Sequence, residues 1–232
     1  MSSIVYLIPT VLHDSAIQTI PPYVIDAVKD CQVIFAENER TTRRFLKSVC
    51  KEIVIDNYEW FTIHKAEEEV IISFKQKIRE RKNIAIISEA GCPGVADPGQ
   101  ILIAAAQEMN AMLKPLVGPS SILLALMASG MNGQQFEFTG YLPIDGSERN
   151  KAITALETSS QKNNSTKIFI ETPYRNNQLI ETLLKVCRST TRLCIAAELT
   201  SPEEFIKTRS IAEWRKEKID LHKKPVIFLL HA

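Results

Sequence analysis

The segment 88–99 constrains the fold of this chain more than any other part of its sequence. It reads SEAGCPGVADPG and continues the apolar run 83–88, which is typical of a strand buried on both faces of a parallel sheet. Asp97 and Pro98 predict that a helix follows, with an N-cap and a proline at its first position. In open α/β sheets, ligands bind outside the carboxyl ends of the strands, where glycines let a backbone approach them closely. We therefore expect a ligand-binding loop in an α/β fold.

Strand and helix patterns alternate along the chain. Val70, Phe74 and Ile78 continue a stripe that begins at Ala66, so an amphipathic helix is expected there. Thr172 and Pro173 repeat the pattern of a cap followed by proline, and residues 161–166 indicate a polar surface loop. The expected strands are Ile4–Ile8, Gln32–Ala36, Asn83–Ser88, Met112–Val117, Phe136–Thr139, Lys167–Ile170, Leu193–Ala197 and Val226–Leu230.

The pattern changes after Gly118, which predicts two α/β domains. Residues 1–117 are expected to form a Rossmann-like, doubly wound parallel sheet, and residues 118–232 a mixed sheet. No G-x-G-x-x-G motif follows the first strand, which argues against a dinucleotide-dependent dehydrogenase.

Composition narrows the function classes. The net charge of +1 excludes nucleic-acid binding by bulk charge, so any RNA contact needs a local basic patch. Five cysteines without CxxC spacing and four scattered histidines predict no metal site and no disulfide framework. Reduced thiols point to the cytoplasm. The apolar N-terminal run is too short to span a membrane, and we expect neither a signal peptide nor membrane association.

Four further motifs follow expected strands, and each has a simpler structural reading. The serines of VGPSS (117–121) could bind a ligand oxygen or only cap a helix. ENER (37–40) begins a possible basic helix face that could grip RNA phosphates or only be solvated. FIETPYR (169–175) and AELTSPEE (197–204) place charged groups at strand ends, where they could form a cleft or only surface ion pairs. The basic face comprises Arg40, Arg43, Arg44 and Lys47.

Taken in order, these motifs resemble those of the tetrapyrrole-methylase superfamily. They are most similar to the branch of ribosomal RNA small-subunit methyltransferase I, which makes 2′-O-methylcytidine. That branch has an SDAGTPGISDPG-like loop, PGPSA, F-x-F-x-G-F-L-P, FYESPHR and ARELTKxxEE. This chain has SEAGCPGVADPG, VGPSS, FEFTGYLP, FIETPYR and AAELTSPEE at the corresponding places.

The resemblance implies a fold, a cofactor and a set of site residues. It implies two α/β domains with a cofactor cleft between them, a homodimer, and ribosomal RNA or the small ribosomal subunit as substrate. The cofactor is S-adenosylmethionine, without a metal. Its expected contacts are Ala90, Gly91, Cys92, Val95, Ser120, Ser121, Ala197 and Pro225. The candidate catalytic residues are Glu37, Glu171 and Glu198 as bases, and Arg40 and Arg175 as phosphate or alkoxide contacts.

Two departures from the branch keep alternatives open. The first loop, PTPIGNLxD in the branch, reads PTVLHD (9–14), and EDTR has become ENER. The acceptor could therefore be a tetrapyrrole, another small molecule or a protein side chain. A non-catalytic protein that binds the cofactor or RNA is a further alternative. Cys92 is interpreted as a packing residue, because no activating base is visible beside it in the sequence.

Overall fold

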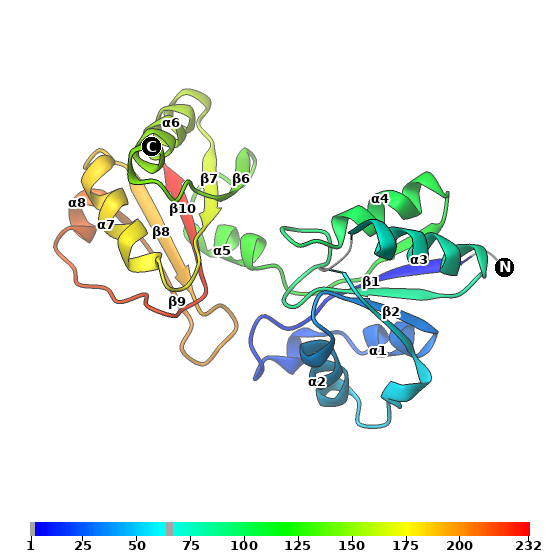
Figure 1. Ribbon diagram of the computed structural model, residues 1–232. Coiled ribbons are helices and arrows are strands. Elements are labelled where there is room, and N and C mark those ends of the chain that lie inside the picture. The colour runs from blue at the N-terminus through cyan, green and yellow to red at the C-terminus, as the bar shows by residue number, and fades with distance from the viewer. Residues whose placement is uncertain (1–2, 64–66) are drawn as a thin grey trace. The chain divides into compact units, whose positions relative to one another are not determined.

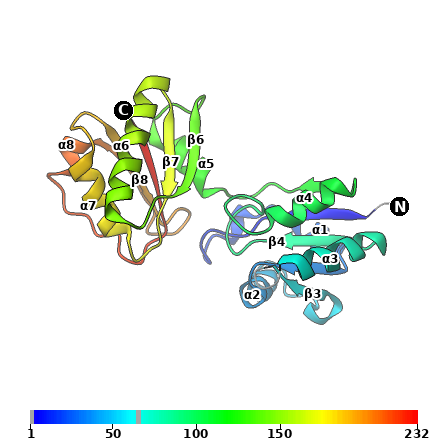
Figure 2. The ribbon, with the colours of Figure 1, turned by 45° about the horizontal axis from the view of Figure 1, so that its top comes forward.

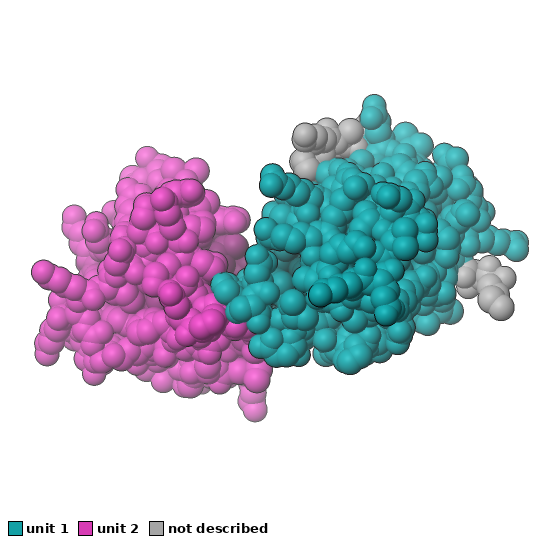
Figure 3. All heavy atoms as spheres, turned by 90° about the horizontal axis from the view of Figure 1, so that it is seen from below, with its two compact units in different colours: residues 1–120 teal, residues 121–232 magenta. Residues whose placement is uncertain are grey.

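A computed structural model describes residues 3–63 and 67–232 of the chain. The described residues form two compact units, 1–120 and 121–232, which Figure 3 colours separately. Each unit has its own five-stranded sheet. The expected combination of a parallel first sheet and a mixed second sheet is confirmed. Ala66, the first member of the expected apolar stripe, lies outside the described residues.

The sheet of the first unit is entirely parallel, with the strand order β3-β2-β4-β1-β5. β1 and β4 therefore lie side by side, and so do β1 and β5, so the loops that follow these strands open at one edge of the sheet. The strands are β1 (Ile4–Ile8), β2 (Val33–Ala36), β3 (Glu59–Thr62), β4 (Ile84–Ile87) and β5 (Met112–Pro115).

Helices cover both faces of this sheet (Figure 1). α1 (Tyr23–Lys29) and α2 (Glu39–Val49) pack on one face, and α3 (Glu67–Arg79) and α4 (Gln100–Glu108) on the other. Successive strand residues point to opposite faces, so each strand contributes to two apolar cores and reads as a continuous hydrophobic run. Short 3-10 turns at Ile17–Thr19 and Ile55–Asn57 complete the unit.

The second unit carries the strand order β6-β7-β10-β8-β9. Only the β6–β7 pair is parallel, and the other pairs are antiparallel. The strands are β6 (Phe136–Tyr141), β7 (Thr166–Ile170), β8 (Arg192–Ala197), β9 (Phe205–Ser210) and β10 (Val226–His231).

An apolar core lies between this sheet and three helices, which Figure 2 shows together on one face. They are α6 (Gly146–Asn163), α7 (Asn176–Val186) and α8 (Ile211–Trp214). α5 (Ser121–Ser129) contacts β9 and β10. Nearly every residue of β8 and β10 is buried, because helices cover both faces of these central strands.

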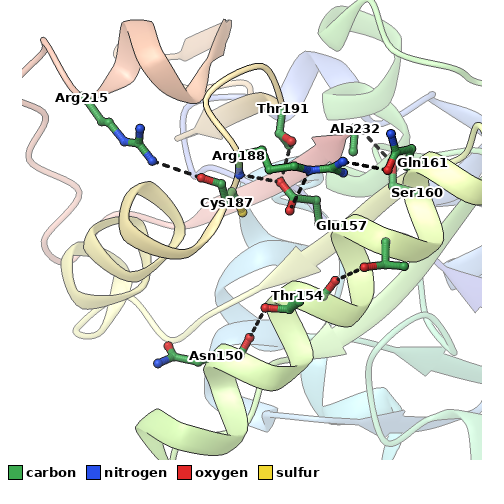
Figure 4. Close-up of polar contacts among 11 residues, drawn as sticks. Asn150, Thr154, Glu157, Ser160, Gln161, Cys187, Arg188, Thr191, Arg215 and Ala232 are labelled. Carbon is green, nitrogen blue, oxygen red and sulfur yellow. Dashed lines mark hydrogen bonds and ion pairs between the residues drawn. The ribbon is translucent and has the colours of Figure 1, made fainter.

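A buried polar network fastens the start of β8 to α6 and α7 (Figure 4). Glu157 of α6 accepts hydrogen bonds from the Thr191 hydroxyl at 2.5 Å and from the Arg188 backbone N–H at 2.8 Å. The Arg188 guanidinium lies 3.2 Å from the second carboxylate oxygen. Glu157 is 6% exposed, so these bonds compensate for taking a charge out of water.

Three local expectations were wrong. α4 begins at Gln100 rather than after Asp97, and α7 begins at Asn176 rather than after Thr172. In both cases the proline lies in a turn that precedes the helix. Asp97 does not cap α4 because its carboxylate accepts from the Gly94 and Gly99 N–H groups within the loop. The first half of the expected loop 161–166 is the end of α6, which continues to Asn163 before a left-handed residue at Asn164 ends it, and Thr166 already belongs to β7.

Within the described ranges, no helix combines the length and the apolar character that crossing a membrane requires.

Candidate functional site

The first loop of the chain pairs with the glycine-rich loop. The Thr10 backbone N–H donates a 2.9 Å hydrogen bond to the Gly91 carbonyl oxygen, and the Ser88 hydroxyl donates to the same oxygen at 3.3 Å. Gly91 has a φ of +78°, a conformation that costs glycine little and strains other residues. The backbone conformation of Gly91 therefore lets its carbonyl oxygen join the loops after β1 and β4.

The loop after β5 joins the same cluster. A Cβ added to Gly118 would lie 2.1 Å from the Cβ of Pro9, so only glycine fits there. The Cys92 thiol lies 3.5 Å from the carbonyl oxygen of Pro119. Residues 9–14, 88–99 and 117–120 thus meet at the carboxyl edge of the parallel sheet. We call these three segments the loop cluster.

Cys92 packs inside this cluster. Burial, and secondarily the negative charge of Asp97, raise the pKa of its thiol above the ordinary value. A raised pKa lowers the thiolate fraction at neutral pH, which opposes a nucleophilic role. The packing interpretation of Cys92 is consistent with this environment.

Asp97 shapes the loop instead of capping α4. Its two carboxylate oxygens accept hydrogen bonds from the backbone N–H groups of Gly94 at 2.9 Å and Gly99 at 2.7 Å. Burial raises the pKa of this carboxyl group, and the two N–H groups act in the opposite direction. Asp97 therefore fixes the turn that presents Val95, whose side chain is 50% exposed.

The ENER segment connects β2 to the loop cluster. The Glu37 carboxylate accepts a 2.7 Å hydrogen bond from the Glu89 backbone N–H, and Asn38 caps α2 by accepting from the N–H groups of Arg40 and Thr41. Arg40 is exposed in the first turn of α2. Asn38 is a capping residue that the sequence analysis missed, although an asparagine before a helical pattern is a standard signal.

The basic face of α2 is partly engaged within the protein. The Arg43 guanidinium lies 2.5 Å from the Glu39 carboxylate and 4.9 Å from the centre of the Trp60 ring. Arg44 forms an exposed ion pair of 3.2 Å with Asp14. Arg40 and Arg44 thus remain accessible to solvent on this face.

A cavity of about 370 Å³ lies between the first loop and α2. α2 contributes four side chains at i, i+3, i+4 and i+7 spacing, so they share one helix face. Of the predicted site residues, only Ala90 lines it. The sequence analysis named Arg44 in the basic face and residues 9–14 as an altered loop, but it missed Thr41, Phe45 and Ser48, because it considered only the basic residues of α2. The lining residues are Thr10, Val11, Leu12, His13, Asp14, Thr41, Arg44, Phe45, Ser48, Glu89 and Ala90.

In the second unit, Glu171 and Arg175 form a buried pair. One carboxylate oxygen of Glu171 accepts from the Arg175 guanidinium at 2.6 and 3.0 Å and from the Thr172 backbone N–H at 2.6 Å. The Glu171 side chain is fully buried, yet its other oxygen has no hydrogen-bond partner among the described residues. A buried acceptor without a donor is costly, so this oxygen can receive a ligand's N–H or O–H.

Three further predicted residues of this unit lie where β8 ends and β10 begins. Ala197 pairs with Val226, and the Glu198 backbone N–H donates a 2.9 Å hydrogen bond to the Pro225 carbonyl oxygen. Glu198 has a φ of +52°, and its carboxylate lies 3.3 Å from the Lys224 ammonium. A second cavity, of about 330 Å³, lies beside Ala197. Its other lining residues are Glu203, Glu204, Phe205, Ile219, Asp220, Leu221 and Lys224.

The predicted site residues divide between the two units. In each unit most of these residues follow or precede strands at one edge of the sheet, whereas Ser121 begins α5. The first unit holds Glu37, Arg40, Ala90, Gly91, Cys92, Val95 and Ser120, and the second holds Ser121, Glu171, Arg175, Ala197, Glu198 and Pro225. In the described part of the chain, no three histidine, cysteine or acidic side chains are grouped so that they could hold a metal ion.

Comparison with known proteins gives a consistent family. The family model of the tetrapyrrole (corrin/porphyrin) methylases matches residues 17–214. A ribosomal RNA small subunit methyltransferase I from Micromonospora olivasterospora is 30% identical over 90% of this chain and 63% of its own length. The protein of that name from Escherichia coli O157:H7 is 28% identical over 97% of this chain and 76% of its own length. The chain thus spans 63% of the first relative and 76% of the second.

Solved structures show the same fold at low sequence identity. The methyltransferase CobJ superposes with a TM-score of 0.66 at 14% identity, covering all of this chain and 94% of its own. A uroporphyrin-III C-methyltransferase from Thermus thermophilus, complexed with S-adenosyl homocysteine, gives 0.58 at 15% identity, covering 99% of this chain and 97% of its own.

Proposed function

The chain belongs to the tetrapyrrole (corrin/porphyrin) methylase family, and on that premise we propose that it is an S-adenosylmethionine-dependent methyltransferase acting on a ribose 2′-hydroxyl of small-subunit ribosomal RNA. The relatives named ribosomal RNA small subunit methyltransferase I support the acceptor. One observation of the structure carries the proposal. The loop cluster, which contains the expected cofactor contacts of the first unit, adjoins a cavity that α2 lines with Thr41, Arg44 and Phe45.

The residues present fit such a cofactor in two respects. Gly91 has a positive φ and no side chain, so its backbone can approach a ligand closely. Glu171 offers a buried carboxylate oxygen without a partner, which fits a ligand that donates hydrogen bonds through hydroxyl or amino groups. The expected cofactor contacts remain Ala90, Gly91, Cys92, Val95, Ser120, Ser121, Ala197 and Pro225.

The chain itself contributes to methyl transfer by aligning the reactants and by placing charged side chains beside them. When bound, S-adenosylmethionine supplies a methyl group that its sulfonium already activates. The cavity beside Ala90 has a volume within the range that holds small ligands, and its hydroxyl, guanidinium and aromatic groups suit a nucleotide. Because a ribose hydroxyl is a weak nucleophile, a carboxylate must accept its proton or a cation must stabilise the developing alkoxide. Glu37, Glu171 and Glu198 are the proposed bases, and Arg40 and Arg175 the proposed cations.

The altered first loop favours testing a second acceptor. His13 and Asp14 line the cavity where the ribosomal branch has glycine and asparagine, so the cavity differs where an acceptor would enter. A tetrapyrrole or a protein side chain is the alternative acceptor. Parallel assays with labelled S-adenosylmethionine should compare small ribosomal subunits, uroporphyrinogen and ribosomal protein. Label confined to RNA and released as a 2′-O-methylnucleoside supports the proposal, and label in either other acceptor rejects it.

We place the protein in the cytoplasm as a homodimer. Met127 of α5 is 79% exposed and Phe136 of the edge strand β6 is 44% exposed, so the second unit presents apolar side chains to solvent. Self-association would cover them. Light scattering should give a mass of two chains, and Met127→Glu should shift it toward one chain. If light scattering gives the mass of one chain for the unchanged protein, the proposed dimer is rejected, and the proposed reaction is not affected.

A further inference from the structure

Two adjacent asparagines fasten the loop 220–224 to the start of α7, past which this loop runs in Figure 1. The fully buried Asn176 side chain donates to the Lys224 carbonyl oxygen at 2.8 Å and to that of Leu221 at 3.4 Å. Asn177 donates to the Asp220 carboxylate at 2.8 Å and accepts from the Leu221 backbone N–H at 2.8 Å. These side-chain bonds therefore hold the loop at residues 220, 221 and 224.

This fixed loop presents an aromatic and cationic cluster to solvent. The Tyr174 ring is 70% exposed, and the His222 ring meets it edge-on at 5.9 Å between centroids. The Lys223 ammonium lies 6.0 Å from the centroid of the Tyr174 ring. The Lys223 backbone N–H also donates a 3.0 Å hydrogen bond to the Pro173 carbonyl oxygen, which keeps the two loops in register. We call Tyr174, His222 and Lys223 the platform.

The surroundings of the platform are basic. Residues 215–224 include five lysines and arginines and only two acidic residues. Glu217 pairs with Arg209 at 2.7 Å, and Lys224 pairs with Glu198 at 3.3 Å. Lys216, Lys218 and Lys223 are exposed cations of this segment. Although the whole chain carries a charge of only +1, this segment is a local basic patch of the kind that RNA contact requires.

We propose that the platform binds single-stranded RNA, with a nucleobase stacked on the Tyr174 ring and the backbone phosphates beside Lys223. In an unpaired strand, bases can stack on an exposed aromatic ring while the phosphates between them contact neighbouring lysines. Platform and buried pair share one short segment, because Tyr174 lies between Glu171 and Arg175 in the chain. The inference rests on the proposed function for its choice of RNA and adds a contact surface outside the predicted site residues.

Binding of a fluorescein-labelled, unstructured RNA of about 12 nucleotides tests the platform by fluorescence anisotropy. Tyr174→Ala should weaken binding by about five- to a hundredfold, whereas Tyr174→Phe, which keeps the ring, should bind like the unchanged protein. Lys223→Gln should lower the slope of log affinity against log salt by about 0.7. Lys185→Gln, an exposed lysine at the end of α7, is the matched control and should leave the slope unchanged.

Equal RNA affinity for Tyr174→Ala and the unchanged protein would overturn the inference, and so would equal losses in the Ala and Phe variants. Thermal unfolding of each variant checks that the fold is retained. Methyl transfer by the unchanged protein is measured separately. If the unchanged protein methylates ribosomal RNA and Tyr174→Ala binds RNA with unchanged affinity, the proposed function stands and the platform proposal is rejected. If RNA binding depends on Tyr174 but no methyl group is transferred to RNA, the platform proposal stands and the proposed function is rejected.

Discussion

The backbone N–H of Glu89 donates a 2.7 Å hydrogen bond to the carboxylate of Glu37. This bond ties the glycine-rich loop to β2 on one side, while Thr10 holds the same loop from the side of β1 through Gly91. The loop expected to bind the cofactor is therefore fixed by residues on both neighbouring strands. Glu37 acts in this account at least as a positioning residue.

Glu37→Ala should weaken S-adenosylmethionine binding about tenfold, because a hydrogen bond to a charged acceptor contributes about 1.5–3 kcal/mol and holds the loop in place. Calorimetry measures the affinity directly. Glu39→Ala, which removes the neighbouring acid at the start of α2 that pairs with Arg43, should bind normally. Glu37→Gln should keep most of the affinity. If Glu37→Gln binds normally but its kcat collapses, the carboxylate is also the base.

Gly118→Ala should destabilise the first unit by about 1–3 kcal/mol, since the new methyl group would lie 2.1 Å from the Cβ of Pro9 and must displace the first loop. Gly146→Ala is the matched control, because a Cβ at that position meets nothing within 4 Å. Thermal unfolding with and without S-adenosylmethionine measures both effects. Equal melting temperatures for the two variants would contradict the close approach of these loops.

Glu157→Ala should destabilise the second unit by about 1–3 kcal/mol, because it leaves the buried Thr191 hydroxyl and the Arg188 backbone N–H without their acceptor (Figure 4). Glu181→Ala on the exposed side of α7 should change stability by less than about 0.5 kcal/mol. Urea unfolding followed by the fluorescence of Trp214, which is buried in this unit, separates the two cases. Similar midpoints for both variants would count against the network.

The alkaline limit of stability should depend on Tyr6. Burial, together with the hydrogen bond that its hydroxyl donates to Asp30 at 2.7 Å, raises the pKa of Tyr6 from 10.0 to about 12. The folded state thus retains this proton where the unfolded state has lost it, so the stabilisation is complete below pH 10 and is lost as the pH rises toward 12. Tyr6→Phe should flatten the fall in melting temperature over that range. An identical fall in both proteins would contradict the assignment.

Sequence periodicity predicted the strands well where burial on both faces makes a continuous apolar run, as in Ile84–Ile87 and Val226–His231. It missed β3 and β9, whose residues are half-buried and mixed in polarity. It also missed α6, whose long polar sequence hides the few residues that it buries, among them Ile153 and Glu157. Strand pairing is a long-range property, and spacing along the chain does not contain it.

The residues of the candidate site were likewise predicted only in part. Local motifs indicated Gly91 and the Glu171–Arg175 pair, because loops at strand ends carry visible signals. The cavity walls were missed, since Thr41 and Ser48 become neighbours of the first loop only once α2 packs against the sheet. The capping role expected of Asp97 was wrong, because the N–H groups of Gly94 and Gly99 take both of its oxygens. Such competition between local acceptors depends on a backbone path that the sequence does not specify.

The most direct test of the central claim is methyl transfer from labelled S-adenosylmethionine to small ribosomal subunits taken from a strain that lacks this gene. Glu37→Ala and Arg40→Ala proteins are run in parallel, with cofactor affinity measured for each. The account predicts label in the ribosomal RNA as a 2′-O-methylnucleoside, with transfer reduced at least about tenfold in both variants. Unlabelled RNA from a protein that binds the cofactor normally would contradict it.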